Sequence, residues 1–118
     1  MRRLSLAVLA VASGTVLSGC ESMITGGPLI RPGEPTGSII VANSSGGNID
    51  VVSISDCDAS TYGIDRLPSD TVIPPGGSYR FTVSAGCWDV DAGAFGKGEA
   101  RQRMHVSAGG ATRYTVTD

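Results

Sequence analysis

Histidine is almost missing from this chain of 118 residues, since His105 is the only one. A serine hydrolase needs a histidine base beside its serine, which is often presented on a Gly-x-Ser-x-Gly turn, and the sequence contains no such turn. A structural zinc ion takes four ligands, more than His105 and two isolated cysteines supply. We therefore expect no catalytic residue, no metal ligand and no cofactor, and we interpret His105 as a surface residue. An enzyme would still require a hollow site that joins His105 to a carboxylate.

Basic residues are also few. The chain has nine lysines and arginines against eleven aspartates and glutamates, a formal charge of −2. Proteins that bind nucleic acid or anionic headgroups electrostatically carry an excess of positive charge. The sequence therefore predicts no nucleic-acid partner. Long helices are not expected either, because the chain contains seventeen glycines and six prolines.

The N-terminal residues follow the three-part layout of a secretory signal. Arg2 and Arg3 form a positive start, residues 4–16 an apolar stretch, and Ser18 and Gly19 the small residues before a cleavage site. The apolar stretch is interrupted by Ser-Gly-Thr and is shorter than the ~20 residues that a membrane-spanning helix needs. We therefore predict that residues 1–19 are a signal peptide.

The sequence Leu17-Ser18-Gly19-Cys20 resembles the lipobox of bacterial lipoproteins, in which an aliphatic and two small residues precede an obligatory cysteine. The resemblance implies a diacylglyceryl group on the Cys20 sulfur, cleavage before Cys20, and acylation of the new amino terminus, for example with palmitate. Two or three acyl chains give stable attachment to a membrane, whereas one holds only marginally. Glu21, in place of the aspartate that favours inner-membrane retention, indicates the outer membrane with the domain facing the periplasm. The alternative is an ordinary cleaved signal in which Cys20 has no special role.

The chain has three cysteines, and an odd number in a secreted protein needs an explanation. If Cys20 carries lipid, Cys57 and Cys87 remain as a disulfide pair in the oxidising periplasm. The chain-entropy gain for the loop that they close is roughly 3.5 kcal/mol. Loss of the signal also removes Arg2 and Arg3, which leaves seven basic and eleven acidic residues and a charge near −4.

The rest of the chain divides into a tether and one small domain. Residues 20–37 are dense in glycine and proline and have no hydrophobic periodicity, which predicts a flexible tether behind the lipidated N-terminus. Residues 38–118 contain about seven short β-rich runs separated by turn residues, which predicts an all-β fold, a small antiparallel β-sandwich. The expected strands are 38–43, 49–55, a short strand or bridge at 71–73, 78–84, 87–94, 99–107 and 112–116.

Alternation within these runs predicts which side chains face the core. The first two strands are expected to form a hairpin, with Val52 and Ile54 of the second directed inward. Aspartates in 87–94 and arginines in 99–107 are expected to oppose one another on a solvent-facing side. The other residues expected to face inward are Tyr79, Phe81, Val83, Trp88, Val90, Ala92, Gln102, Met104, Val106, Tyr114 and Val116.

Five segments carry a second resemblance: Ile40-Val41-Ala42-Asn43-Ser44, Val52-Ser53-Ile54-Ser55, Ile73-Pro74-Pro75-Gly76-Gly77-Ser78, Phe81-Thr82-Val83 and Gly86-Cys87-Trp88-Asp89-Val90. Together they resemble a group of small secreted bacterial β-domains, which are similar to immunoglobulin-like or transthyretin-like sandwiches. The resemblance implies a fold and no activity, because the group has no assigned function. The chain departs from the group by using Cys57 where members often place a second cysteine near the last strand.

Two other features have competing interpretations. The loop 56–70 carries Asp56, Asp58, Asp65 and Asp70, which are either a calcium site built from carboxylate oxygens or solvated loop residues; no known calcium-loop spacing is present. Trp88 is expected to pack in the core behind the disulfide, and its alternative role is a platform for carbohydrate.

The sequence favours a non-catalytic, lipid-anchored protein of the cell envelope whose β-sandwich is an accessory or protein-interaction module. Its expected partners are the membrane, through lipid on Cys20, and an envelope protein of unknown identity. The alternative is a glycan- or peptide-binding module in the periplasm or at the cell surface, which would use the loop 56–70 with Tyr62. An exposed aromatic cluster beside that loop would favour the alternative, whereas burial of Trp88, Tyr79 and Tyr114 would count against it.

Overall fold

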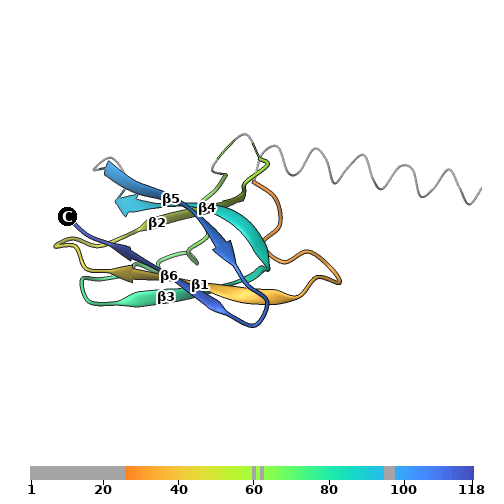
Figure 1. The fold of residues 1–118 in the computed structure, drawn as a ribbon. Coiled ribbons are helices and arrows are strands. Elements are labelled where there is room, and N and C mark those ends of the chain that lie inside the picture. Colours follow the sequence, from red (N-terminus) through yellow and green to blue (C-terminus); the bar gives the residue numbers. More distant parts are fainter. Residues whose placement is uncertain (1–25, 60, 62, 95–97) are drawn as a thin grey trace, which may run out of the picture.

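The computed structural model describes residues 26–59, 61, 63–94 and 98–118. These residues form six β-strands and no helix (Figure 1), which confirms the predicted all-β class. The run at 71–73 contributes only an isolated bridge between Ile49 and Ile73. It does not extend into a strand because Pro74 and Pro75 follow at once and lack the N–H that a ladder needs. The strands are β1 (Thr36–Asn43), β2 (Val51–Asp56), β3 (Ser78–Ser84), β4 (Gly86–Ala94), β5 (Gly98–Val106) and β6 (Ala111–Val116).

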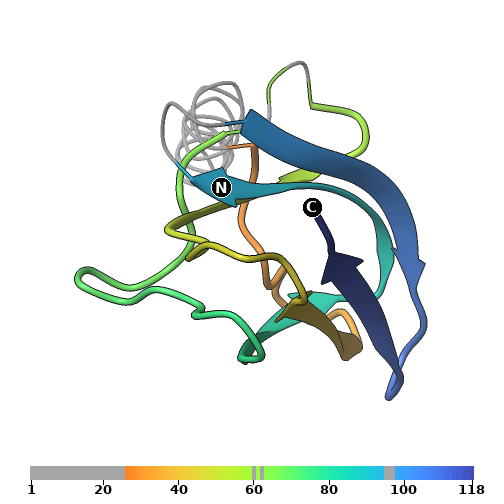
Figure 2. The same ribbon diagram turned by 90° about the vertical axis from the view of Figure 1, so that its left-hand side faces the viewer.

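The strands form two three-stranded sheets, with the orders β3-β1-β6 and β2-β4-β5. Viewed along the strands, the sheets face each other, and β6 of one sheet approaches β5 of the other on one side (Figure 2). The sequence predicted an antiparallel sandwich. The sandwich differs from this prediction in one pair of strands, because β1 and β6 run parallel. Both start at the same end of the molecule, since β5 returns the chain to that end before β6 begins.

The predicted hairpin between the first two strands is wrong, because β1 and β2 belong to different sheets. The side chain of Asn43, at the end of β1, explains the crossing. Its amide donates 2.8 Å hydrogen bonds to the carbonyls of Gly47 and Ile73, and its oxygen accepts one from the N–H of Ser45. These bonds fold the connection over the end of the sandwich and satisfy a buried polar group, so the chain crosses to the other sheet.

The core lies between the two sheets, and its inward positions match the alternation in most strands. Val52 and Ile54 are fully buried, as predicted, while Tyr79 is only half-buried. Gln102 was predicted to face inward and is exposed, because β5 is the edge strand of its sheet and leaves this polar side chain in reach of water. The other buried core residues are Ile39, Val41, Ile49, Leu67, Ile73, Phe81, Val83, Trp88, Val90, Ala92, Met104, Val106, Tyr114 and Val116.

The folded unit begins before residue 38, within the stretch that was predicted to be a tether. β1 already starts at Thr36, and residues 26–35 pack along the domain through backbone hydrogen bonds. Because these bonds use main-chain groups, the segment folds without a hydrophobic period in its sequence. The correction applies to residues 26–37, and residues 20–25 lie outside the described residues. The carbonyls of Gly26, Leu29 and Pro35 accept hydrogen bonds from the N–H groups of Asp56, Ser84 and Ala85, at 2.9, 2.7 and 2.8 Å.

The two ends of the sandwich differ and are called the disulfide end and the open end. At the disulfide end, β1 and β4 begin and β2 stops beside the N-terminal segment of residues 26–35. At the open end, β1, β4 and β6 stop. β4 has nine residues, which separates the ends by about 30 Å.

Candidate functional site

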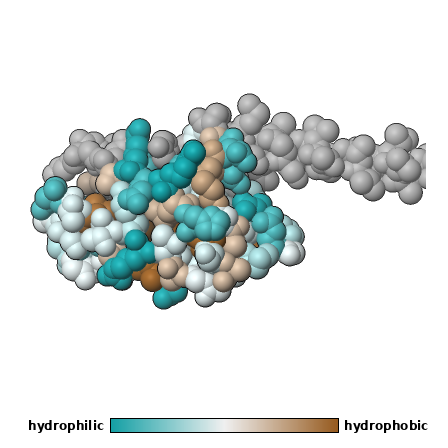
Figure 3. Space-filling view, in the orientation of Figure 1, coloured by the Kyte–Doolittle hydropathy of each residue, from teal (hydrophilic) through white to brown (hydrophobic). Residues whose placement is uncertain are grey.

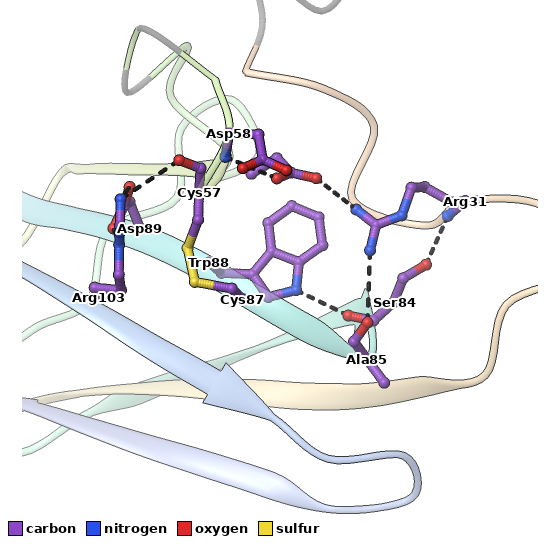
Figure 4. The surroundings of a disulfide bond; sticks show 10 residues. Arg31, Cys57, Asp58, Ser84, Ala85, Cys87, Trp88, Asp89 and Arg103 are labelled. Carbon is purple, nitrogen blue, oxygen red and sulfur yellow. Dashed lines mark hydrogen bonds and ion pairs between the residues drawn. A yellow bond between two sulfur atoms is a disulfide. The ribbon is translucent and has the colours of Figure 1, made fainter.

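The disulfide end is built around the bond between Cys57 and Cys87, which confirms the predicted pairing (Figure 4). Cys57 directly follows β2 and Cys87 is the second residue of β4, so the bond ties two neighbouring strands where their pairing begins. Trp88 is fully buried, and its indole N–H donates a 2.8 Å hydrogen bond to the carbonyl of Ser84. The interpretation of Trp88 as a core residue is thus confirmed. No face of its ring is available as a carbohydrate platform.

Arg31 closes this end from the N-terminal segment (Figure 4). Its guanidinium lies over the Trp88 ring, 5.0 Å from the ring centroid, and its Nη1 is 3.0 Å from the Asp56 carboxylate. Its backbone N–H donates to the Ser84 hydroxyl at 2.7 Å, and Nε pairs with Glu34 at 3.0 Å. A cation over an aromatic face and a partly buried ion pair both favour this docked arrangement. No pattern in the sequence marks Arg31 as a site residue, because it stands alone in a Gly/Pro-rich stretch.

The four aspartates of the loop 56–70 do not gather around a common point. Asp56 pairs with Arg31, and Asp65 accepts hydrogen bonds from the N–H groups of Val52 and Leu67 at 2.9 and 3.0 Å. No group of three or more potential metal ligands occurs among the residues that the structure describes. The calcium interpretation therefore has no geometric support there. The two remaining aspartates, Asp58 and Asp70, are exposed.

Arg66 is a structural residue that the sequence reading overlooked. Its guanidinium donates hydrogen bonds to the carbonyl of Ile54 at 3.0 Å and to that of Gly27 at 2.8 Å. Burial lowers the pKa of Arg66 below its usual value, and the guanidinium stays charged at physiological pH. Arg66 and Asp65 together form hydrogen bonds with backbone groups on the outer edge of β2. Without these bonds, the backbone groups would be open to water.

His105 lies on the outer face of β5 and is exposed, as predicted. Within the part of the chain that is described, no hydrogen bond or ion pair joins its side chain to a carboxylate. The register instead places Asp89 opposite Arg103 and Asp91 opposite Arg101, with nitrogen–oxygen distances of 2.9 and 3.4 Å. The predicted acid–base pairs across β4 and β5 are thus confirmed, but Asp91 is buried and does not face solvent as predicted.

The open end holds a pocket of about 340 Å³ between the loop after β1, the end of β4 and the last residues of the chain. The pocket exists because small side chains leave space there: Ala92, Gly93 and Ala94 on β4 and Ala100 on β5 line it. The apolar residues Ile49 and Val116 also line the pocket, together with the polar residues Ser45, Asn48 and Asp118. The Asp118 carboxylate accepts a hydrogen bond from the N–H of Gly46 at 3.1 Å.

The positions of the aromatic residues do not support a platform for carbohydrate. Trp88 and Tyr114 are buried and Tyr79 is half-buried beside Phe81, with ring centroids 4.8 Å apart. Burial, together with the negative charge of Asp91, raises the pKa of Tyr114 above its usual value near 10. Tyr62 and Cys20, which carry the binding-loop and lipid predictions, lie outside the described residues.

Among the described residues, none belongs to a helix that is long and apolar enough to cross a membrane. No protein-family model matches the chain, and no curated protein matches it by sequence.

Proposed function

We propose that this protein is a lipid-anchored component of the bacterial cell envelope whose β-sandwich works by contact, as an accessory or protein-interaction module. The observation that carries the proposal is Leu17-Ser18-Gly19-Cys20 at the end of an apolar stretch that follows Arg2 and Arg3. The ion pairs Arg31–Asp56, Arg101–Asp91 and Arg103–Asp89 engage several charged groups of the described residues in structural contacts, which supports a non-catalytic role.

The docking of the N-terminal segment gives the anchor a geometric consequence. Six peptide units separate Cys20 from Gly26, and a fully extended chain of that length spans about 20 Å at most. Gly26 is hydrogen-bonded to Asp56 at the disulfide end. Lipid on Cys20 would therefore keep the disulfide end within about 20 Å of the membrane, and the open end lies about 30 Å further along β4.

A second candidate function is a glycan- or peptide-binding module, and the open-end pocket is the observation that favours it. Its volume of about 340 Å³ is at the lower limit of small-ligand sites. The buried state of Trp88 and Tyr114 favours a peptide over a sugar, because sugars are commonly held on exposed aromatic rings.

Metabolic labelling with radioactive palmitate, followed by membrane fractionation, tests the anchor. We expect the natural chain and a Ser18→Ala variant, which keeps a small residue at that position, to take up label and to sediment with membranes. The Cys20→Ala variant should do neither. Label or membrane association that persists in Cys20→Ala would refute the anchor.

A further inference from the structure

The outer edge of β3 carries backbone groups that have no hydrogen-bond partner among the residues that the structure describes. In an antiparallel pair, successive residues direct their N–H and C=O groups to opposite sides. The carbonyl of Gly77 accepts a hydrogen bond from the N–H of Asn43, toward β1, whereas the N–H of Ser84 points away from β1 to the carbonyl of Leu29. The residues between them alternate accordingly, and one set points outward. The outward set is Ser78, Arg80 and Thr82, all with exposed side chains and no hydrogen bond on that edge from any described residue.

The outer edge of β2, in the opposite sheet, differs because loop residues form hydrogen bonds with its backbone groups. On β2, Val52 donates to the Asp65 carboxylate and accepts from the N–H of Arg66, and Asp56 donates to Gly26. The chain thus covers the edge of β2 with loop residues and leaves most of β3 uncovered. On β3, Leu29 covers only the last residue, Ser84. An uncovered strand edge is a template on which another extended chain can add a strand.

The outer face beside this edge has a distinct charge. Arg80 on β3 and Arg113 on β6 are both in register with Ile40 on β1, so the two exposed arginines stand on either side of one half-buried isoleucine. Neither arginine forms an ion pair with a described residue. No acidic residue occurs on this face of the three strands, whose other positions include Thr36, Ser38, Ala42, Ser78, Thr82, Ala111 and Thr115.

Figure 3 shows mostly hydrophilic and neutral colour on the face it presents, with hydrophobic colour confined to small separate areas. No broad apolar surface is visible there that would bind a partner by burial alone. The exposed side chains of the β3 edge, Ser78, Arg80 and Thr82, are polar, so recognition there would depend on backbone hydrogen bonds and charge.

A second copy of this chain fits the edge poorly. In the antiparallel register that pairs all three outward residues of two β3 strands, Ser78 would lie opposite Thr82, and Arg80 opposite Arg80 of the other copy. Like charges directly opposite each other destabilise a strand pair. An acidic side chain at that position would instead form a cross-strand pair with Arg80.

We infer that the β3 edge is the partner-binding surface of this module, and that it takes an extended peptide segment which adds as a fourth strand and places an acidic residue opposite Arg80. The inference deepens the proposed function, because it names the surface and the partner chemistry of the interaction module. It rests on that module acting by contact, and it does not require lipid on Cys20.

Amide hydrogen exchange of the full chain, with short synthetic peptides as probes, tests the inference. The peptides alternate threonine and valine and carry glutamate, glutamine or lysine at the centre. We expect the glutamate peptide to slow exchange at the N–H groups of Ser78, Arg80 and Thr82. It should bind about two- to fivefold more tightly than the glutamine peptide, the range of one opposite-charge cross-strand pair, and the lysine peptide should bind most weakly.

Two variants separate the backbone and charge contributions. Thr82→Pro removes an outward N–H without removing a bond to β1, and edge strands accept proline at such positions. It should weaken all three peptides by about two- to tenfold, the usual range for one hydrogen bond. Arg80→Glu should reverse the preference to the lysine peptide, whereas the matched control Arg113→Glu, two strands away, should leave the glutamate peptide first.

The inference would be overturned if none of the peptides protected these three amides, or if protection appeared at the open-end pocket instead. Protection in the chain alone that grew with its concentration would identify a second copy as the occupant and would also overturn it. Membrane association of the Arg80→Glu and Thr82→Pro variants reports separately on the lipid anchor. A failure of the edge is therefore distinct from a failure of the anchor.

Discussion

Removal of the Cys57–Cys87 disulfide should cost this small domain a large part of its stability. The cysteines are 30 residues apart in sequence, and the loop between them contains all of β3. Closing a loop of this length restricts the unfolded chain by roughly 3.5 kcal/mol on the chain-entropy model. A domain of this size has a total stability of about 5–10 kcal/mol. We expect the Cys57→Ser/Cys87→Ser double variant to lose about 3 kcal/mol and to remain folded at low temperature.

Urea-induced unfolding, followed by tryptophan fluorescence, measures this loss. Trp88 is the only tryptophan in the sequence, and it is fully buried beside the disulfide, so its emission reports on the domain directly. A reducing agent should lower the stability of the natural protein to that of the double variant and should leave the double variant unchanged. A loss below about 1 kcal/mol would refute the reasoning, since it lies well under the loop-closure value. An equal effect of the reducing agent on the double variant would do the same.

Three further predictions concern the segment before β1, a close backbone contact and alkaline pH. Arg31→Ala should lower the free energy of unfolding by about 1–2 kcal/mol, because it removes the contact with Trp88 and the ion pair with Asp56. The control Arg113→Ala should change the free energy of unfolding by less than about 0.5 kcal/mol in the same urea titration. Gly37→Ala should lower the free energy of unfolding by about 1–3 kcal/mol, because the new Cβ would lie 2.5 Å from the carbonyl oxygen of Ser107. Gly47→Ala is the neutral control, because its new Cβ would have no atom within 4 Å. Equal melting temperatures of the two variants would contradict this prediction. Because burial and Asp91 raise the pKa of Tyr114, the folded state holds the phenol proton more tightly than the unfolded state does. Stability should therefore be unaffected by this group below pH ~10 and fall above it, by at most about 1.4 kcal/mol per pH unit. Tyr114→Phe should flatten that decline in unfolding titrations, and an unchanged slope would contradict the assignment.

Much of the strand pattern could be predicted from sequence because each strand repeats a local signal. Alternation placed Val52 and Ile54 inward, and the aspartates of β4 opposite the arginines of β5. The cysteine count paired Cys57 with Cys87. These features depend on residues close in sequence or on a choice among very few partners.

The docking of Arg31 could not be predicted in this way. The residue lies 25 positions before Asp56 and 57 before Trp88, and its neighbours have no period that would mark them as folded. Its contacts exist only after β2 and β4 have brought Asp56 and Trp88 together. Gly26 and Leu29 likewise bind through backbone groups, which leave no side-chain pattern in the sequence.

The sequence by itself determined the class of fold, the faces of most strands and the disulfide, because local alternation and composition encode them. The tertiary structure alone decided that β1 lies between β3 and β6, and that the edge of β2 is covered while most of β3 is open. Strand partners are chosen by contacts between distant segments, and a strand has the same alternation whichever neighbour it pairs with. The proposed binding edge at Arg80 therefore became visible only when the sheets were assembled.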